Sequence, residues 1–194
     1  MDNRKVGELI FQLRKEKGLT QKQLADQMNI SDRTISKWER GIGCPDVSLL
    51  SSLSAILGVN IENILGGELS PNEFVGGNMK KSNYYVCPTC HNIVLATGEV
   101  TISCCGRKLE RLEAKKATDE EKLSITEMDN EWYITSEHPM TKEHYVSFIA
   151  FATGEQVQIM KQYPEWNLQA RIPKRKHGKI VWYDTQLGLF YQLI

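Results

Sequence analysis

Four of the five cysteines in this chain lie within nineteen residues, and this cluster constrains the local fold more than any other feature. The segment Cys87-Pro-Thr-Cys90 is followed, after thirteen residues, by Cys104-Cys105-Gly106. Two turns that each present two thiolates can enclose one ion tetrahedrally, a donor set that suits zinc or iron. Adjacent cysteines are poorly placed to form a disulfide with each other. We therefore predict one metal ion per chain, iron or zinc, bound by Cys87, Cys90, Cys104 and Cys105.

The choice of a metal site over disulfides depends on the compartment in which the chain resides. Its first residues, MDNRKVGELIFQLRKEKG, are charged and lack the apolar core of a secretory signal. The sequence has no run of apolar residues long enough to span a bilayer. We expect a cytoplasmic protein without a membrane partner, in which thiols stay reduced.

The chain changes character along its length, which predicts a multidomain protein with an α part and a β part. Residues 4–65 have helical periodicity, residues 66–82 contain four glycines and a proline, and the remainder consists of short β-branched and aromatic runs. The predicted units are a DNA-binding domain at 1–66, a linker at 67–82, a four-cysteine metal-binding β domain at 83–115 and a β-sandwich at 116–194. Large aromatic residues are expected to fill the sandwich core: Trp132, Trp166, Trp182 and Phe190.

The N-terminal part predicts five helices. Apolar residues share one face of a helix over residues 4–17, and Gly18 ends it. Thr20 and Gln23 form a capping box for a second helix, and Ser31 caps a third. A fourth helix is expected over 47–57 and a fifth over 61–65. Two short helices joined by a tight turn within such a unit indicate a helix-turn-helix.

The string LTQKQLADQMNISDRTISKWERG closely resembles the phage-repressor-type (Xre) family of helix-turn-helix regulators, and the resemblance covers residues 4–65. It implies double-stranded DNA as the partner, with the third helix in the major groove and Ile35 and Trp38 in the core. Base-facing side chains are then expected from Asp32, Arg33 and Lys37, although Asp32 could simply favour the helix N-terminus. Further contacts to bases or phosphates are implied for Thr34, Ser36, Gln21 and Arg40.

Charge qualifies this interpretation. Lys+Arg and Asp+Glu are equal at 24 each, and residues 1–66 contain nine basic and eight acidic residues, a net charge of +1. Because so small a charge gives weak non-specific attraction to DNA, we expect binding to two half-sites and hence a homodimer.

The C-terminal part resembles a second family in two segments. The run YYVCPTCHNIVLATGEVTISCCG is similar to desulforedoxin, which implies iron held by four cysteines in a cage that zinc can also occupy. The run HPMTKEHYVSFI, from His138 to Ile149, resembles desulfoferrodoxin and superoxide reductase, which implies a small immunoglobulin-like β-sandwich. The catalytic iron of that family has four histidine ligands and one cysteine.

The resemblance fails at three of those five ligands. Leu123 stands at the first histidine, Asp184 at the cysteine and Leu187 at the last histidine, so that only His138 and His144 remain. Leucine cannot bind iron, so we predict a vestigial metal site, no enzyme activity and no small-molecule substrate. The two histidines could instead form structural hydrogen bonds, or Asp184 could complete a two-histidine site.

Three hypotheses for function follow. The first is a sequence-specific transcription regulator whose four-cysteine centre responds to redox state or metal. In the second, the metal is purely structural and supports dimer formation. In the third, the chain is an active superoxide reductase with a DNA-binding appendage.

Overall fold

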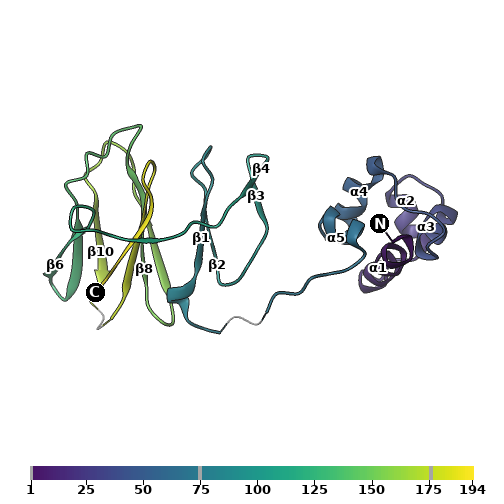
Figure 1. The fold of residues 1–194 in the computed structure, drawn as a ribbon, viewed down its shortest axis with the longest axis horizontal. Helices are drawn as coiled ribbons and strands as arrows, with labels where there is room; N and C mark the ends of the chain where they lie inside the picture. The colour runs from purple at the N-terminus through teal and green to yellow at the C-terminus, as the bar shows by residue number, and fades with distance from the viewer. Residues whose placement is uncertain (1, 74–75, 175–176) are drawn as a thin grey trace. The chain divides into compact units, whose positions relative to one another are not determined.

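The structure of the 194-residue chain, a computed structural model, describes residues 2–73, 76–174 and 177–194. The chain forms two compact units, Met1–Pro71 and Asn72–Ile194, here named the N-terminal and C-terminal units (Figure 1). Residues 74 and 75 of the expected linker lie outside the described residues. Across the described ranges, no helix combines the length and the apolar character needed to cross a membrane.

The N-terminal unit contains the five predicted helices. They are α1 (Asn3–Glu16), α2 (Gln21–Gln27), α3 (Asp32–Glu39), α4 (Val47–Leu57) and α5 (Ile61–Gly66). The capping box is present, because the Thr20 hydroxyl accepts the Gln23 N–H and the Gln23 side chain accepts the Thr20 N–H. The Ser31 hydroxyl accepts the Thr34 N–H at 3.2 Å and begins α3. Local side chains therefore fix where the two helices of the motif start.

One core holds the five helices together, and a glycine lets two of them approach closely. The core consists mainly of Val6, Leu9, Ile10, Leu13, Leu24, Ile35, Trp38, Leu50, Leu53, Leu57 and Ile64. Gly7 of α1 faces the end of α3, where an added Cβ would lie 2.1 Å from the Trp38 carbonyl oxygen. Only a residue without a side chain permits that contact, which positions α3 against α1.

The C-terminal unit is a β structure preceded by one 3-10 turn (Met79–Lys81). Its strands in the described residues are β1 (Asn83–Val86), β2 (Ile93–Ala96), β3 (Ile102–Cys104), β4 (Arg107–Leu109), β5 (Lys115–Lys116), β6 (Ser124–Met128), β7 (Glu131–Thr135), β8 (Val146–Ala152), β9 (Val157–Lys161), β10 (Gln169–Pro173), β11 (Lys179–Asp184) and β12 (Gly188–Leu193). A five-stranded sheet has the order β5-β12-β11-β8-β9, and a three-stranded sheet has the order β10-β7-β6. Two antiparallel ribbons, β1-β2 and β3-β4, complete the unit.

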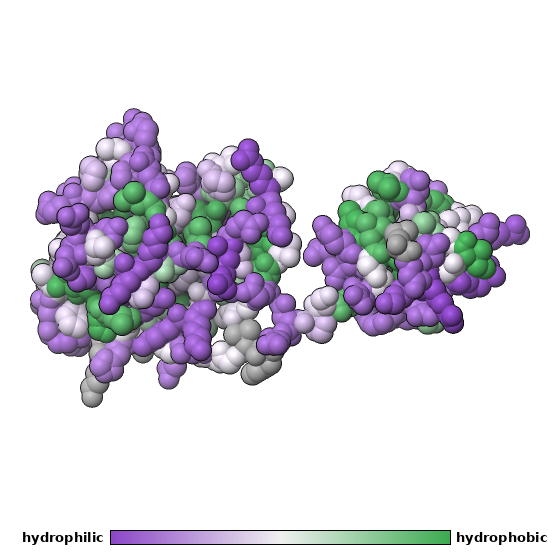
Figure 2. Space-filling view, in the orientation of Figure 1, coloured by the Kyte–Doolittle hydropathy of each residue, from purple (hydrophilic) through white to green (hydrophobic). Residues whose placement is uncertain are grey.

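Strand β8 is buried along its whole length, because the five-stranded sheet is covered on both faces. Ile149 and Phe151 face a core shared with β7 and β10, whereas Phe148 and Ala150 face a core shared with β1. The apolar run of this strand is the sequence counterpart of burial on two sides. Hydrophilic side chains cover most of the visible face of the unit, with apolar patches between them (Figure 2).

The segments 83–115 and 116–194 lie in one compact unit, in which Tyr84 and Val86 of β1 pack against Phe148 of β8. One expectation about the core differs from the structure. Trp182 and Phe190 are buried as predicted, but Trp166 is 71% exposed and was wrongly assigned to the core. Trp166 follows a short turn instead of lying in a strand, so no sheet face covers it.

Candidate DNA-binding helix and metal-ligand clusters

Helix α3 presents charged side chains on one side and packs into the core with the other. Ile35 is 0% and Trp38 4% exposed. Asp32, Arg33 and Lys37 are exposed, at positions that helical geometry places away from those two anchors. Arg33 and Lys37 form no side-chain hydrogen bond or ion pair within the described ranges, so both cationic groups are available to a partner.

The remaining predicted contacts are partly engaged within the protein. Thr34 and Ser36 are half-buried, and the Thr34 hydroxyl lies 2.9 Å from that of Ser31. The exposed Arg40 donates from Nε to the Ser36 carbonyl oxygen at 3.1 Å. These residues can support α3 without losing their remaining hydrogen-bonding capacity.

Gln21 lies in a buried network that sequence reasoning missed. Its side-chain amide donates to Glu39 at 2.8 Å, and Arg14 donates to the same carboxylate through Nε at 2.5 Å and through its terminal nitrogen at 2.9 Å. The hydrogen bond to Glu39 raises the pKa of Arg14 above its usual value. The network ties α1, α2 and α3 together, and it engages the Gln21 side chain within the protein.

The four predicted cysteine ligands come together in the C-terminal unit. Their sulfur atoms all lie within 4.8 Å of one another, and the Sγ atoms of Cys90 and Cys104 are 3.5 Å apart. Bonds of about 2.3 Å to a tetrahedral ion place sulfurs about 3.8 Å apart, so the cluster has the dimensions of a zinc or iron cage. The backbone after the cysteine pair turns through the left-handed region, since Cys105 has φ 51° and Gly106 φ 73°.

Hydrogen bonds within this cluster separate the acidities of its thiols. The N–H of Cys90 is the main cause of a lowered pKa of about 6 for Cys87. Hydrogen bonding with Cys90 raises the pKa of Cys104 and raises that of Cys105 to about 12. A coordinated cation removes this asymmetry, because a thiol bound to a metal is deprotonated. The donor set therefore fits a metal ion better than it fits four free thiols.

A second group of ligand-type side chains converges beside the sandwich core. Asp184, at the end of β11, is 3% exposed, and its Oδ2 lies 3.1 Å from His138 Nε2 and 2.9 Å from His144 Nε2. Its Oδ1 accepts the backbone N–H groups of Gln186 and Leu187, both at 2.8 Å. Burial raises the pKa of Asp184, but these N–H groups and His144 outweigh it and lower the pKa overall.

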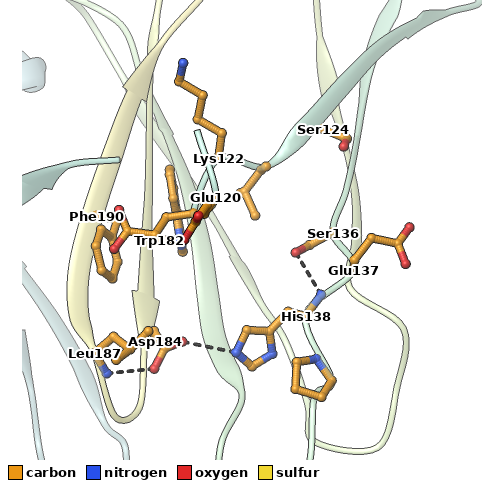
Figure 3. Close-up of a pocket in the computed structure, with 13 residues that line it drawn as sticks. Glu120, Lys122, Ser124, Ser136, Glu137, His138, Trp182, Asp184, Leu187 and Phe190 are labelled. Carbon is orange, nitrogen blue, oxygen red and sulfur yellow. Dashed lines mark hydrogen bonds and ion pairs between the residues drawn. The ribbon is translucent and has the colours of Figure 1, made fainter. Parts of the chain in front are cut away.

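A cavity of about 370 Å³ adjoins this group (Figure 3). Leu123 and Leu187, at the positions of two absent ligands, line it together with His138, Trp182 and Asp184. The fold thus gathers in one place the positions that the family resemblance related to an iron site. Sequence reasoning treated Asp184 only as an alternative, since nothing local marks a residue 40 positions from His144 as its partner.

Comparisons with known proteins agree with this division of the chain. Residues 10–64 match the helix-turn-helix family. The activator BcrR of Enterococcus faecalis is 46% identical over 61 residues, which is 31% of this chain and 30% of BcrR. The immunity repressor of Bacillus phage phi105 is 38% identical over 63 residues, which is 32% of this chain and 44% of the repressor. The chain therefore spans less than half the length of these relatives.

The C-terminal unit is similar to a different solved structure. The superoxide reductase of Treponema pallidum superposes with a TM-score of 0.50 at 12% identity, covering 58% of this chain and 98% of that one. At this identity the likeness establishes the fold alone. The N-terminal unit therefore contains a segment that matches the helix-turn-helix family, joined in one chain to a β-rich unit whose fold is similar to that of a superoxide reductase.

Proposed function

We propose that this protein is a sequence-specific transcription regulator that binds double-stranded DNA as a homodimer. The observation that supports this function is the exposure of Arg33 and Lys37 on α3, opposite the buried Ile35 and Trp38. A helix held in this way can enter the major groove with its outward side chains toward the base edges.

The chemistry of α3 suggests a role for each side chain. Arg33 can form a bidentate pair with guanine, Asp32 can accept from a cytosine amine and Lys37 can bind a base or a phosphate. Thr34, Ser36, Arg40 and Gln21 are proposed to contribute further base or phosphate contacts, including through the backbone at the start of α2. The small net charge favours a dimer on two half-sites over a monomer on one.

The test is to select binding sites from random double-stranded DNA and then compare Arg33→Ala with Lys5→Ala on the selected site. Lys5 is exposed on α1 beside Gly67, at the end of α5, and its loss changes the charge equally. Arg33→Ala should cost about 1–3 kcal/mol and relax base preference at one position, whereas Lys5→Ala should preserve that preference. Equal effects of the two variants would contradict a recognition role for α3.

The four-cysteine centre is proposed to bind iron or zinc and to make DNA binding depend on its state. Cys90 and Cys105 are exposed, so an oxidant or a chelator can reach the cluster. Loss or oxidation of the metal would loosen both turns and thereby alter the dimer. Operator affinity measured with reduced, oxidised and metal-free protein tests this part, and equal affinity in all three states would refute it.

A purely structural metal is the second candidate for this centre. Cys87 is 0% exposed and packs with Tyr85 and Leu109 between the two ribbons, where an ion would join β1-β2 to β3-β4. Zinc in protein purified from cells, without absorption in the visible range, would support this candidate over the sensor.

Superoxide reductase activity is not part of the proposed function. Leu123 and Leu187 supply no ligand, and Asp184 stands where a thiolate would donate electrons. Iron-loaded protein should not reduce superoxide above the rate of free iron. A turnover that His138→Ala abolishes would contradict this.

A further inference from the structure

Three side chains from separate segments direct ligand atoms at one point in the C-terminal unit. His138 follows β7, His144 precedes β8 and Asp184 ends β11. His138 Nε2 and His144 Nε2 are 3.3 Å apart, and Asp184 Oδ2 lies 3.1 Å from the first and 2.9 Å from the second. Two imidazole nitrogens and a carboxylate oxygen thus form a small triangle.

The edges of this triangle match those of three neighbouring ligands on one cation. Bonds of about 2.0–2.2 Å, at angles between those of an octahedron and a tetrahedron, give ligand separations of about 2.9–3.5 Å. All three measured separations fall within that range. An arrangement of hydrogen bonds alone does not require the two histidine nitrogens to approach each other, because each ring needs only the carboxylate.

The charge of Asp184 also calls for a cation at this point. The side chain is 3% exposed, and its Oδ1 accepts two backbone N–H groups and also lies 3.0 Å from His144 Nε2. Its Oδ2 lies within 3.1 Å of both histidine Nε2 atoms. Within the described part of the chain, no lysine or arginine forms an ion pair with it; the nearby Lys122 pairs with Asp119 instead. A buried carboxylate needs either a protonated imidazole or a metal ion as its counter-charge.

We infer that His138, His144 and Asp184 form a second metal site, which binds one divalent transition-metal ion of the zinc, cobalt or ferrous-iron class. Two imidazoles and a carboxylate suit these ions. The site differs from the four-cysteine cluster in every ligand, and binding there does not depend on the proposed DNA-binding function. The adjoining cavity, which His138 and Asp184 both line, leaves room beside these two ligands for water or a small anion (Figure 3).

A hydrogen bond to His138 should give this second site a lower metal affinity than the four-cysteine cluster. Its Nδ1 accepts the Met140 N–H at 3.0 Å, so without a metal its proton resides on Nε2 and is donated to Asp184. A cation at Nε2 would displace that proton, which would then reside on Nδ1, where it prevents Nδ1 from accepting the Met140 N–H. His144 has no such bond at Nδ1 in the described ranges and needs no comparable change. The four-cysteine cluster should therefore fill first.

The test is a titration of the full-length protein with Co²⁺ after the four-cysteine cluster has been saturated with Zn²⁺. The wild-type chain should take up one further equivalent of Co²⁺ with weak visible bands and no thiolate charge transfer. Asp184→Asn and His144→Ala should each lose that equivalent. Asp184→Asn keeps an oxygen that can accept the N–H groups of Gln186 and Leu187, so its turn is preserved.

Glu137→Gln is the matched control, because Glu137 lines the same cavity, is exposed and points away from Asp184 (Figure 3). This variant should bind Co²⁺ as the wild type does. A second readout is the imidazole ¹⁵N spectrum, in which Zn²⁺ should shift the Nε2 signals of both histidines in wild-type protein only. Absence of a second equivalent in the wild type, or an unchanged titration in Asp184→Asn, would overturn the assignment.

Discussion

Arg14 and Glu39 are 25 positions apart in sequence, yet their side chains are each only 4% exposed and in direct contact. Removing one member of a buried ion pair leaves the other charge without compensation, which costs more than the pair contributes while intact. Gln21 donates to the same carboxylate, so three helices depend on one residue.

We therefore expect Arg14→Met to lower the free energy of unfolding of the N-terminal unit by about 3–5 kcal/mol. Arg4→Met is the control, since Arg4 and its partner Glu8 are 86% and 69% exposed and such surface pairs contribute about 0–1 kcal/mol. Urea denaturation followed by far-ultraviolet circular dichroism measures both. Similar losses in the two variants would show that burial of Glu39 carries no penalty.

Replacing Tyr84 is expected to raise stability, whereas replacing Arg14 is expected to lower it. Its ring is 4% exposed, its hydroxyl has no hydrogen-bond partner in the described ranges, and burial raises its pKa to about 12. Because an unpaired buried hydroxyl is unfavourable, Tyr84→Phe should stabilise the C-terminal unit by about 1 kcal/mol.

Tyr84 should also make the free energy of unfolding depend on pH. A pKa raised in the folded state contributes stability that is complete below the unfolded value of about 10 and is lost as pH rises toward about 12. Urea midpoints across that range should fall more steeply for the wild type than for Tyr84→Phe. Parallel curves would mean that the phenol is not the group responsible.

Whether a residue's role could be predicted from the sequence depended on how far apart its partners lie along the chain. Ile35, Trp38 and the four cysteines were predictable, because their spacing within one segment carries the signal. The partners of Glu39 were not predicted, and the contact of Asp184 with the two histidines was only one of two alternatives. Each pairing joins segments that only the folded chain brings together.

At the scale of elements, the contact between α1 and α3 sets the orientation of the proposed recognition helix. Alanine normally stabilises a helix by about 0.5–1 kcal/mol relative to glycine. At Gly7 the added Cβ would meet the Trp38 carbonyl oxygen at 2.1 Å, a backbone atom that cannot turn aside.

Gly7→Ala should therefore destabilise the N-terminal unit by about 1–3 kcal/mol and weaken DNA binding by displacing α3. Gly66→Ala in α5 has open space around its Cβ and should be neutral or slightly stabilising. Thermal denaturation and DNA titration of the two variants provide the comparison. A stable Gly7→Ala variant with full affinity would contradict the packing.

The elements themselves were predicted unevenly. The five helices followed from periodicity and caps, and the strands from β-branched runs. The pairing of β5 with β12 could not be predicted, since a strand of two residues leaves no local pattern that names its partner.

For the whole molecule, the two compact units predict two separate responses to loss of the four-cysteine metal. Replacing Cys87 and Cys90 with serine should lower the melting temperature of the C-terminal unit and leave the helical transition unchanged, because the ligands and the helices belong to different cores. Circular dichroism of the helical signal and tryptophan fluorescence can follow the two transitions. A matched fall in both would indicate that the units stabilise each other.

Strand β8 has a thermodynamic consequence for the C-terminal unit. One of its faces supports the layer that carries the cysteine cage, and the other packs into the core beside His138 and Asp184. A strand shared in this way makes the two layers melt as one. Any ion that binds either cluster then protects the same cooperative transition. Near the melting temperature, chelating one ion should therefore release the other, because the unit that holds both unfolds.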